Sequence, residues 1–251
     1  MTTQKRLDLT VYAPALVTND ARTLAIVLGM ERALPGLCLK WEVGKGGSPI
    51  ELPQRDAWLV EATTRGKLPL LCNGDESYPV TVSGRGRAGR LCPGGQSLLD
   101  VHAELPLDAA VIATAGEMLE RVAEGARAFW GHATPDAAAL DIAYQTAPTL
   151  EGPPSPRRGL PALKLLEQIR APEIPYFLGW LNYWSPGAAE AIGFPDPARD
   201  AELLSRSRRT ATGGWVVHLT DAPLDLDNPA HLDALKRAYE RFPEIGGRST
   251  P

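Results

Sequence analysis

The residues best suited to chemistry lie near the C-terminus, in one eleven-residue stretch. They are Asp221, Asp225, Asp227 and His231. Three carboxylates and an imidazole at this spacing could hold a hard cation or supply acid–base groups. The same stretch has the features of a helix start, because Asn228 is a good N-cap and Pro229 a good first helical residue. We therefore expect turns, capping or partner binding here, and no metal; a metal-dependent hydrolase that uses Asp221–His231 is the alternative.

A glycine-rich segment from Gly84 to Gly89 follows a predicted strand and matches the pattern G-x-G-x-x-G. In a dinucleotide site such glycines let backbone N–H groups approach a pyrophosphate at a helix N-terminus. The residues that follow, Arg90 to Gly95, contain Pro93 and cannot open a helix. The pattern therefore predicts a flexible connection between strands and no bound cofactor. Arg85, Arg87 and Arg90 remain a candidate anion-binding patch, which an anionic small molecule or nucleotide would use.

Aromatic side chains gather in the last third of the chain. The candidates for partner binding are Trp180, Tyr183, Trp184 and Trp215, together with Asp221, Asp225 and Asp227. Core packing is the default role of such aromatic residues, although Trp and Tyr also dominate the hot spots of protein interfaces. No G-x-S-x-G elbow accompanies any of the histidines, His218 included. We therefore predict no catalytic residue.

Composition limits the class of protein. The chain has 251 residues, 44% of them apolar, and a net charge of −4 with a pI near 5.6. A nucleic-acid binder would normally carry a basic excess, so we expect no nucleic-acid partner. We also expect no membrane association, because no apolar run approaches the roughly 20 residues of a membrane span and the N-terminal residues do not form a signal peptide. The three separated cysteines, Cys38, Cys72 and Cys92, fit reduced thiols in the cytoplasm.

Periodicity predicts alternating strands and helices. Strands are expected over residues 7–13, 38–43, 57–62, 78–83, 97–105, 176–184 and 214–220, and helices over 20–34, 109–130, 186–192, 197–204 and 229–242. Many neighbouring strands lack a long crossover between them, which favours antiparallel pairing. The predicted class is α/β (α+β), with a mixed, largely antiparallel sheet, helices packed on it and two strand-helix halves.

A proline-rich stretch runs from Thr149 to Pro161 and is typical of a linker or a long surface loop. The part of the chain after it has only about 90 residues, which is small for an independent core. We therefore predict a single domain over residues 1–251. A subdivision into 1–148 and 160–251 around this loop is the alternative.

Five motifs in the last third carry a family resemblance. They are Gly-Trp-Leu-Asn-Tyr-Trp-Ser-Pro from Gly179, Ile-Gly-Phe-Pro-Asp-Pro-Ala-Arg-Asp from Ile192, Gly-Gly-Trp-Val-Val-His-Leu-Thr from Gly213, Pro-Leu-Asp-Leu-Asp-Asn-Pro-Ala-His from Pro223, and Glu-Arg-Phe-Pro-Glu-Ile-Gly-Gly-Arg from Glu240. They resemble a bacterial family of unknown function common in myxobacteria and, more weakly, the immunity proteins of polymorphic toxin systems. The resemblance implies a non-enzymatic, cytoplasmic protein-binding protein whose partner is a cognate toxin, often a nuclease. It carries over no catalytic residue.

Overall fold

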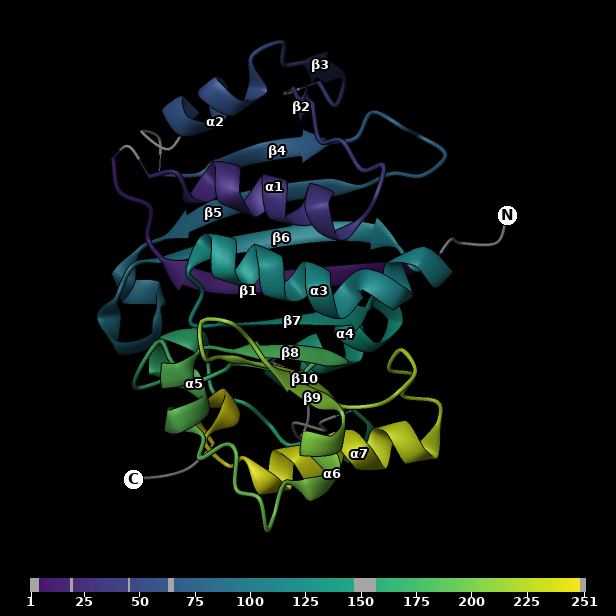
Figure 1. Cartoon of the computed structure of the whole chain (residues 1–251). Coiled ribbons are helices and arrows are strands. Elements are labelled where there is room, and N and C mark those ends of the chain that lie inside the picture. Colours follow the sequence, from purple (N-terminus) through teal and green to yellow (C-terminus); the bar gives the residue numbers. More distant parts are fainter. Residues whose placement is uncertain (1–4, 19, 45, 63–65, 147–156, 249–251) are drawn as a thin grey trace, which may run out of the picture.

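A single ten-stranded sheet forms the centre of the computed structural model, which describes residues 5–18, 20–44, 46–62, 66–146 and 157–248 (Figure 1). The strands are β1 (Arg6–Pro14), β2 (Trp41–Val43), β3 (Pro49–Glu51), β4 (Leu68–Cys72), β5 (Thr81–Arg87), β6 (Leu98–Pro106), β7 (Trp130–Pro135), β8 (Leu181–Trp184), β9 (Ser207–Arg209) and β10 (Trp215–His218). Their order is β3-β2-β4-β5-β6-β1-β7-β8-β10-β9, and every pairing between described strands is antiparallel. The predicted largely antiparallel α+β class is confirmed.

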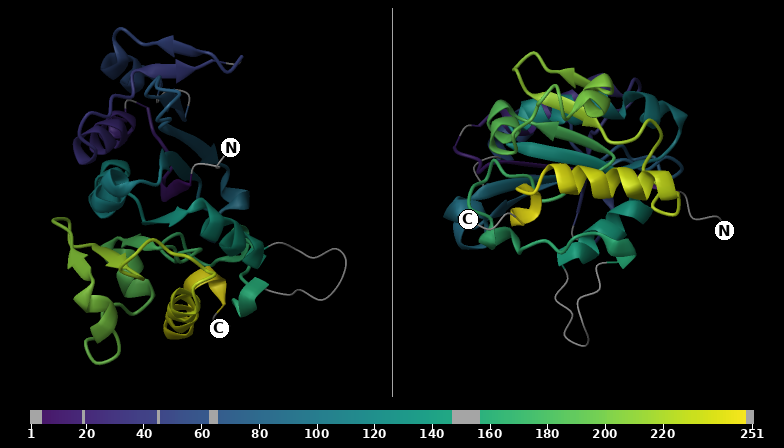
Figure 2. Two further views of the ribbon diagram at one scale, coloured as in Figure 1. Left: turned by 90° about the vertical axis from the view of Figure 1, so that its right-hand side faces the viewer. Right: turned by 90° about the horizontal axis from the view of Figure 1, so that it is seen from below.

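Helices cover both faces of this sheet. They are α1 (Arg22–Ala33), α2 (Arg55–Ala62), α3 (Ala109–Ala126), α4 (Asp136–Ala143), α5 (Pro186–Ala191), α6 (Ala201–Ser205) and α7 (Pro229–Arg241). Figure 2 shows α1 and α3 on one side of the sheet and α4 and α7 on the other. No helix among the described residues combines the length and the apolar character that crossing a membrane requires.

The side chains of the central strand β1 point alternately to the two faces of the sheet. Its alternation places Leu7, Leu9 and Val11 in the core that α1 and α3 cover, while Asp8 and Thr10 point to the opposite face. β1 pairs with β6 along nine residues and with β7 along six. The sequence periodicity of this strand is therefore matched by its burial.

Helices α1 and α3 approach each other closely through two glycines. A Cβ added at Gly125 of α3 would lie 2.9 Å from the backbone oxygen of Ala25, and one added at Gly29 of α1 would lie 2.9 Å from that of Arg121. α3 begins at Asp108, whose side chain accepts a hydrogen bond of 2.8 Å from the backbone N–H of Val111. Both contacts fix the helix layer on this face of the sheet.

A row of aromatic rings forms the core on the opposite face. Tyr12 and Trp130 stack with ring centroids 4.3 Å apart, and His132 lies 6.4 Å from Trp130 and 6.1 Å from Phe177. Burial lowers the pKa of His132 to about 4, with a smaller contribution from His102. His132 is therefore a neutral core side chain at physiological pH.

Several predicted elements differ from the structure. The helix expected over 197–204 begins only at Ala201, and the strand expected over 176–184 spans only Leu181–Trp184. The helix expected over 109–130 ends at Ala126, because Arg127 adopts the left-handed conformation that closes a helix, at φ 54°. Glycine usually occupies that position, so the sequence offered no stop signal, and β7 was missed. The strand expected over 57–62 was wrong: these residues belong to α2, whose start Pro53 and Asp56 signal.

The glycine-rich segment was predicted as a flexible connection, which was wrong for its first half. Gly84 and Gly86 lie inside β5, where the backbone pairs with β6. A Cβ at Gly84 would meet the Cβ of Leu68 at 3.0 Å and a methyl of Leu99 at 3.2 Å. Close packing between β4 and β6 therefore accounts for Gly84, and strand pairing engages the backbone that a pyrophosphate would need.

Residues 149–156 of the proline-rich loop predicted over 149–161 lie outside the described residues. On either side of it, strands β7 and β8 pair directly, with Trp130 opposite Trp184 and Ala133 opposite Leu181. One sheet therefore runs through both predicted strand-helix halves.

The close approach of α1 and α3 predicts a cost for Gly125→Ala. The new methyl would clash with the backbone of Ala25, and this strain exceeds the helix-propensity gain of about 1 kcal/mol. We expect the free energy of unfolding, measured by urea denaturation, to fall by about 1–2 kcal/mol. Gly187→Ala in α5 is the matched control, because its Cβ would make only an ordinary contact at 3.5 Å. A neutral Gly125→Ala would contradict this packing.

The buried imidazole predicts a pH dependence of stability. The pKa of His132 is about 4 in the folded chain against an ordinary value of 6.5, so below pH 6.5 the unfolded chain binds the proton preferentially. The free energy of unfolding should fall by about 1.4 kcal/mol for each pH unit between 6.5 and 4 through this group alone. His132→Asn, measured by denaturant unfolding at pH 7, 6 and 5, should remove that part of the slope. If the pH dependence of the free energy of unfolding is the same in His132→Asn, the low pKa assigned to His132 is wrong.

Candidate partner-binding surface

A loop with alternating leucines and aspartates connects β10 to α7. We call residues 219–228 the acidic loop. Leu224 and Leu226 point inward and are 2% and 4% exposed, whereas Asp225 and Asp227 are exposed. Asp221, earlier in the loop, has a side chain that is 88% exposed. Two buried leucines therefore anchor a segment that presents three carboxylates to solvent.

The polar groups of the acidic loop mostly serve its own backbone. The side chain of Asp225 accepts from the N–H of Asp227 at 3.0 Å, and Nδ1 of His231 accepts from the N–H of Asp225 at 3.1 Å. Asn228 caps α7 by accepting from the N–H of Ala230 at 3.0 Å, and Asp227 pairs with Arg158 at 2.8 Å. These are the turn and capping roles expected of such residues, so the geometry does not favour the hydrolase alternative.

Groups with metal-ligand character meet elsewhere among the described residues, on the face of the sheet opposite α1 and α3. One ligand atom each from Asp8, His102 and Glu104 lie within 4.8 Å of one another. Burial raises the pKa of Asp8, His102 opposes the rise and Glu104 reinforces it. Glu104 is already ion-paired with Arg6. Two carboxylates and an imidazole could bind a divalent cation. This cluster shares no residue with the acidic loop.

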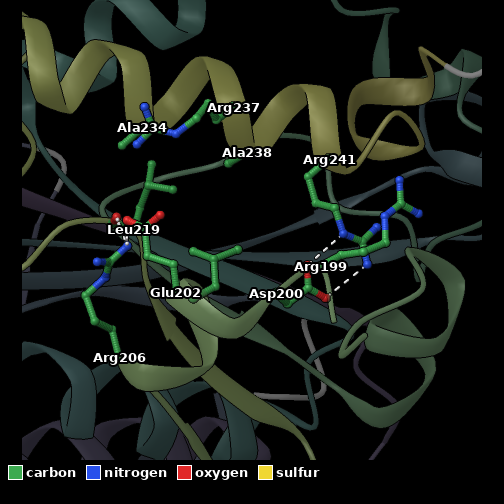
Figure 3. Close-up of a pocket in the computed structure, with 10 residues that line it drawn as sticks. Arg199, Asp200, Glu202, Arg206, Leu219, Ala234, Arg237, Ala238 and Arg241 are labelled. Carbon is green, nitrogen blue, oxygen red and sulfur yellow. Dashed lines mark hydrogen bonds and ion pairs between the residues drawn. The ribbon is translucent and has the colours of Figure 1, made fainter. Parts of the chain in front are cut away.

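A narrow groove lies between α6 and α7, and Leu219, the first residue of the acidic loop, forms part of its lining (Figure 3). We call it the α6–α7 groove. Its volume is about 140 Å³. Its charged lining residues are Arg199, Asp200, Glu202, Arg206, Arg237 and Arg241. Four guanidinium groups against two carboxylates make this groove positive, although the chain as a whole carries a net charge of −4.

A buried ion pair holds one wall of the α6–α7 groove. The carboxylate of Asp200, whose side chain is fully buried, accepts from Nε of Arg241 at 2.6 Å and from Nη2 at 3.0 Å. The N–H of Asp196 also donates to Asp200, at 2.7 Å, and Arg241 donates to the carbonyl of Gly193 at 2.8 Å. The pair joins α7 to the loop before α6 with a two-pronged geometry.

Arg206 links the groove to the acidic loop. Its guanidinium donates to the carbonyls of His218 at 3.4 Å and Leu219 at 3.2 Å, and to the carboxylate of Glu202 at 3.1 Å. Its Nε lies 3.9 Å from the carboxylate of Asp221. The groove and the acidic loop are therefore parts of one surface on which both charges occur.

Three of the four predicted partner-binding aromatics lie in the core. Trp180 is 2% exposed, Tyr183 3% and Trp184 1%, so their rings are not available to a partner in this conformation. Trp215 is half-buried and packs edge-to-face on Phe194, with ring centroids 5.3 Å apart. Trp215 is therefore the one aromatic candidate that a partner can reach. The three predicted aspartates are also exposed.

The predicted anion-binding arginines are only partly brought together. Arg85 and Arg87 lie on β5, and Arg87 donates to the carboxylate of Asp100 at 2.8 and 2.6 Å. Arg85 is exposed opposite Asp100 in the strand register, and Arg90 lies beyond the strand in a short 3₁₀ turn, Gly89–Leu91. Asp100 therefore neutralises the centre of this patch.

Sequence reasoning missed the arginines of the α6–α7 groove. Arg237 and Arg241 stand four residues apart on α7, so they share a helix face, and this was the one available signal. Arg199 and Arg206 flank the short helix α6. Their approach to α7 depends on tertiary packing, which residue spacing does not reveal.

Comparison with known proteins identifies a family and a similar fold. Residues 18–250 match a family model described as "Domain of unknown function (DUF5953)". No curated protein matches the sequence. The solved structure of Pseudomonas aeruginosa T6SS protein PA0821 is similar, with a TM-score of 0.53 and 16% sequence identity. The alignment covers 95% of this chain and 73% of that one, and at this identity the likeness concerns the fold alone.

The buried ion pair predicts a large difference between two arginines of α7. Arg241→Met leaves the fully buried carboxylate of Asp200 without its partner, which should lower the free energy of unfolding by about 3–5 kcal/mol. Arg237→Met, one turn earlier and exposed, should change it by less than about 0.5 kcal/mol. Denaturant unfolding of both variants measures the difference. Equal effects would mean that Asp200 does not depend on Arg241.

Proposed function

The chain belongs to the DUF5953 family, whose function is unknown, and we propose that it is a non-enzymatic protein of the bacterial cytoplasm that binds a cognate protein toxin and neutralises it. The acidic loop and the half-buried Trp215 form the centre of the proposed contact. The observation that carries the proposal is the exposure of three loop carboxylates on a backbone anchored by Leu224 and Leu226.

The fold of the chain is compatible with a toxin-related role. The similar solved structure is that of a Pseudomonas aeruginosa T6SS protein. The likeness extends along 95% of this chain, so it concerns the whole architecture rather than one motif. The resemblance of the C-terminal motifs to immunity proteins is an independent reason for the same proposal.

The electrostatics of the acidic loop indicate the chemistry of the partner. Asp221 and Asp227 have side chains that are 88% and 83% exposed, so a partner can reach both carboxylates. Exposed acids attract a basic surface and speed its association, as nuclease toxins with basic substrate grooves would require. The anchoring leucines keep the loop in one conformation, which reduces the entropy lost on binding.

The proposal predicts the outcome of co-expression with the product of the gene immediately upstream. The wild-type chain should restore growth of cells that express this product and should bind it in isothermal titration calorimetry. The triple variant Asp221→Asn, Asp225→Asn, Asp227→Asn should lower the association rate about tenfold and flatten its salt dependence. Asparagine keeps the hydrogen-bond acceptors of the loop, so the fold should be retained.

A matched control removes the same charge from the N-terminal half. Asp56→Asn, Asp75→Asn and Glu76→Gln together change three exposed acids far from the acidic loop in the sequence, and should leave binding and rescue unchanged. Wild-type protein that neither binds the upstream product nor protects against it would overturn the proposal. If both triple variants weaken binding equally, the acidic loop is not the surface that binds the upstream product.

A further inference from the structure

We propose that the α6–α7 groove is a binding site for aliphatic carboxylates, either the acidic side chains of a protein segment or a free dicarboxylate. The inference is tested separately from toxin neutralisation, because its probes are carboxylates and its variants change Arg199 and Arg237, which lie outside the acidic loop. Figure 3 shows these arginines around the groove: Arg199 lies beside Arg241 at one end, and Arg237 extends along α7 towards Ala234 at the other.

Two of the four arginines have no acidic partner of their own. Arg199 and Arg237 are exposed, and neither makes an ion pair with any residue in the described part of the chain. A guanidinium presents a planar set of donors that matches a carboxylate with two parallel hydrogen bonds. The groove therefore offers two unused binding groups for carboxylates.

The other two arginines make the site rigid. Arg241 is fixed by Asp200 and by the carbonyl of Gly193, and Arg206 is fixed by the carbonyls of His218 and Leu219. Asp200 and Glu202 balance their charges, so the net positive charge of the groove comes from Arg199 and Arg237. A ligand would therefore need to order only Arg199 and Arg237, which limits the entropy cost of binding.

The floor of the groove selects a carboxylate with an aliphatic stem over a compact anion. Between the arginines the lining is apolar, formed by Leu203, Leu219, Ala234 and Ala238. Methylene groups gain free energy by covering such a surface, whereas a strongly hydrated phosphate gains nothing there. Because the free arginines stand at opposite ends, a ligand with two separated carboxylates can reach both.

Titration of the ¹⁵N-labelled full chain by NMR tests the site with three probes. They are glutarate, a capped tripeptide with two glutamates around an alanine, and inorganic phosphate. We expect saturable shifts at α6 and α7 with at least one carboxylate probe, and at least tenfold weaker binding of phosphate. The double variant Arg199→Ala, Arg237→Ala should raise the dissociation constant of the carboxylate at least fivefold.

The matched control is the double variant Arg32→Ala, Arg127→Ala, which removes the same charge from exposed arginines on another part of the chain. It should leave carboxylate binding unchanged. Tighter binding of the tripeptide identifies a protein segment as the source of the carboxylates, and tighter binding of glutarate identifies a free dicarboxylate. Three results would overturn the proposal: no saturable binding of either carboxylate, phosphate binding as tight as theirs, or equal effects of the two double variants.

Discussion

The pairing of β7 with β8 is the constraint on which the rest of the structure depends. β7 lies between β1 and β8, and all six of its residues are buried. Gly131 permits the close approach of β1, since a Cβ there would lie 2.5 Å from a methyl of Val11. Through this one strand the sheet of the N-terminal half continues into β8, β10 and β9, and these strands support α6, α7 and the acidic loop.

Long elements with regular periodicity could be predicted from the sequence. Burial alternates along most of strands β1 and β6, and α3 and α7 carry capping residues, Asp108 and Asn228, before an amphipathic run. Short elements could not. β7 reads Trp-Gly-His-Ala-Thr-Pro, which follows a helix without a glycine stop, and only its neighbours in the sheet make it a strand.

Only the part of the candidate surface that lies in one continuous segment, the acidic loop, could be predicted from the sequence. Asp221, Asp225 and Asp227 are contiguous enough for their exposure to follow from turn and cap chemistry. The aromatic candidates were harder, because a strand pattern does not distinguish a core face from an exposed one when both faces are covered, as at Tyr183. The α6–α7 groove draws on three separate segments, and residue spacing carries no record of their contact.

Opposite charges placed side by side give the proposed contact its specificity. The acidic loop and the arginines of the groove meet at Arg206, so a partner that covers both would have to match both signs in one orientation. Hydrogen–deuterium exchange of the complex with the upstream gene product tests this most directly. We predict that binding slows exchange in residues 199–206 and 219–241 more than elsewhere. Protection confined to the face of β5 and β6, with none at these residues, would contradict the assignment of the binding surface.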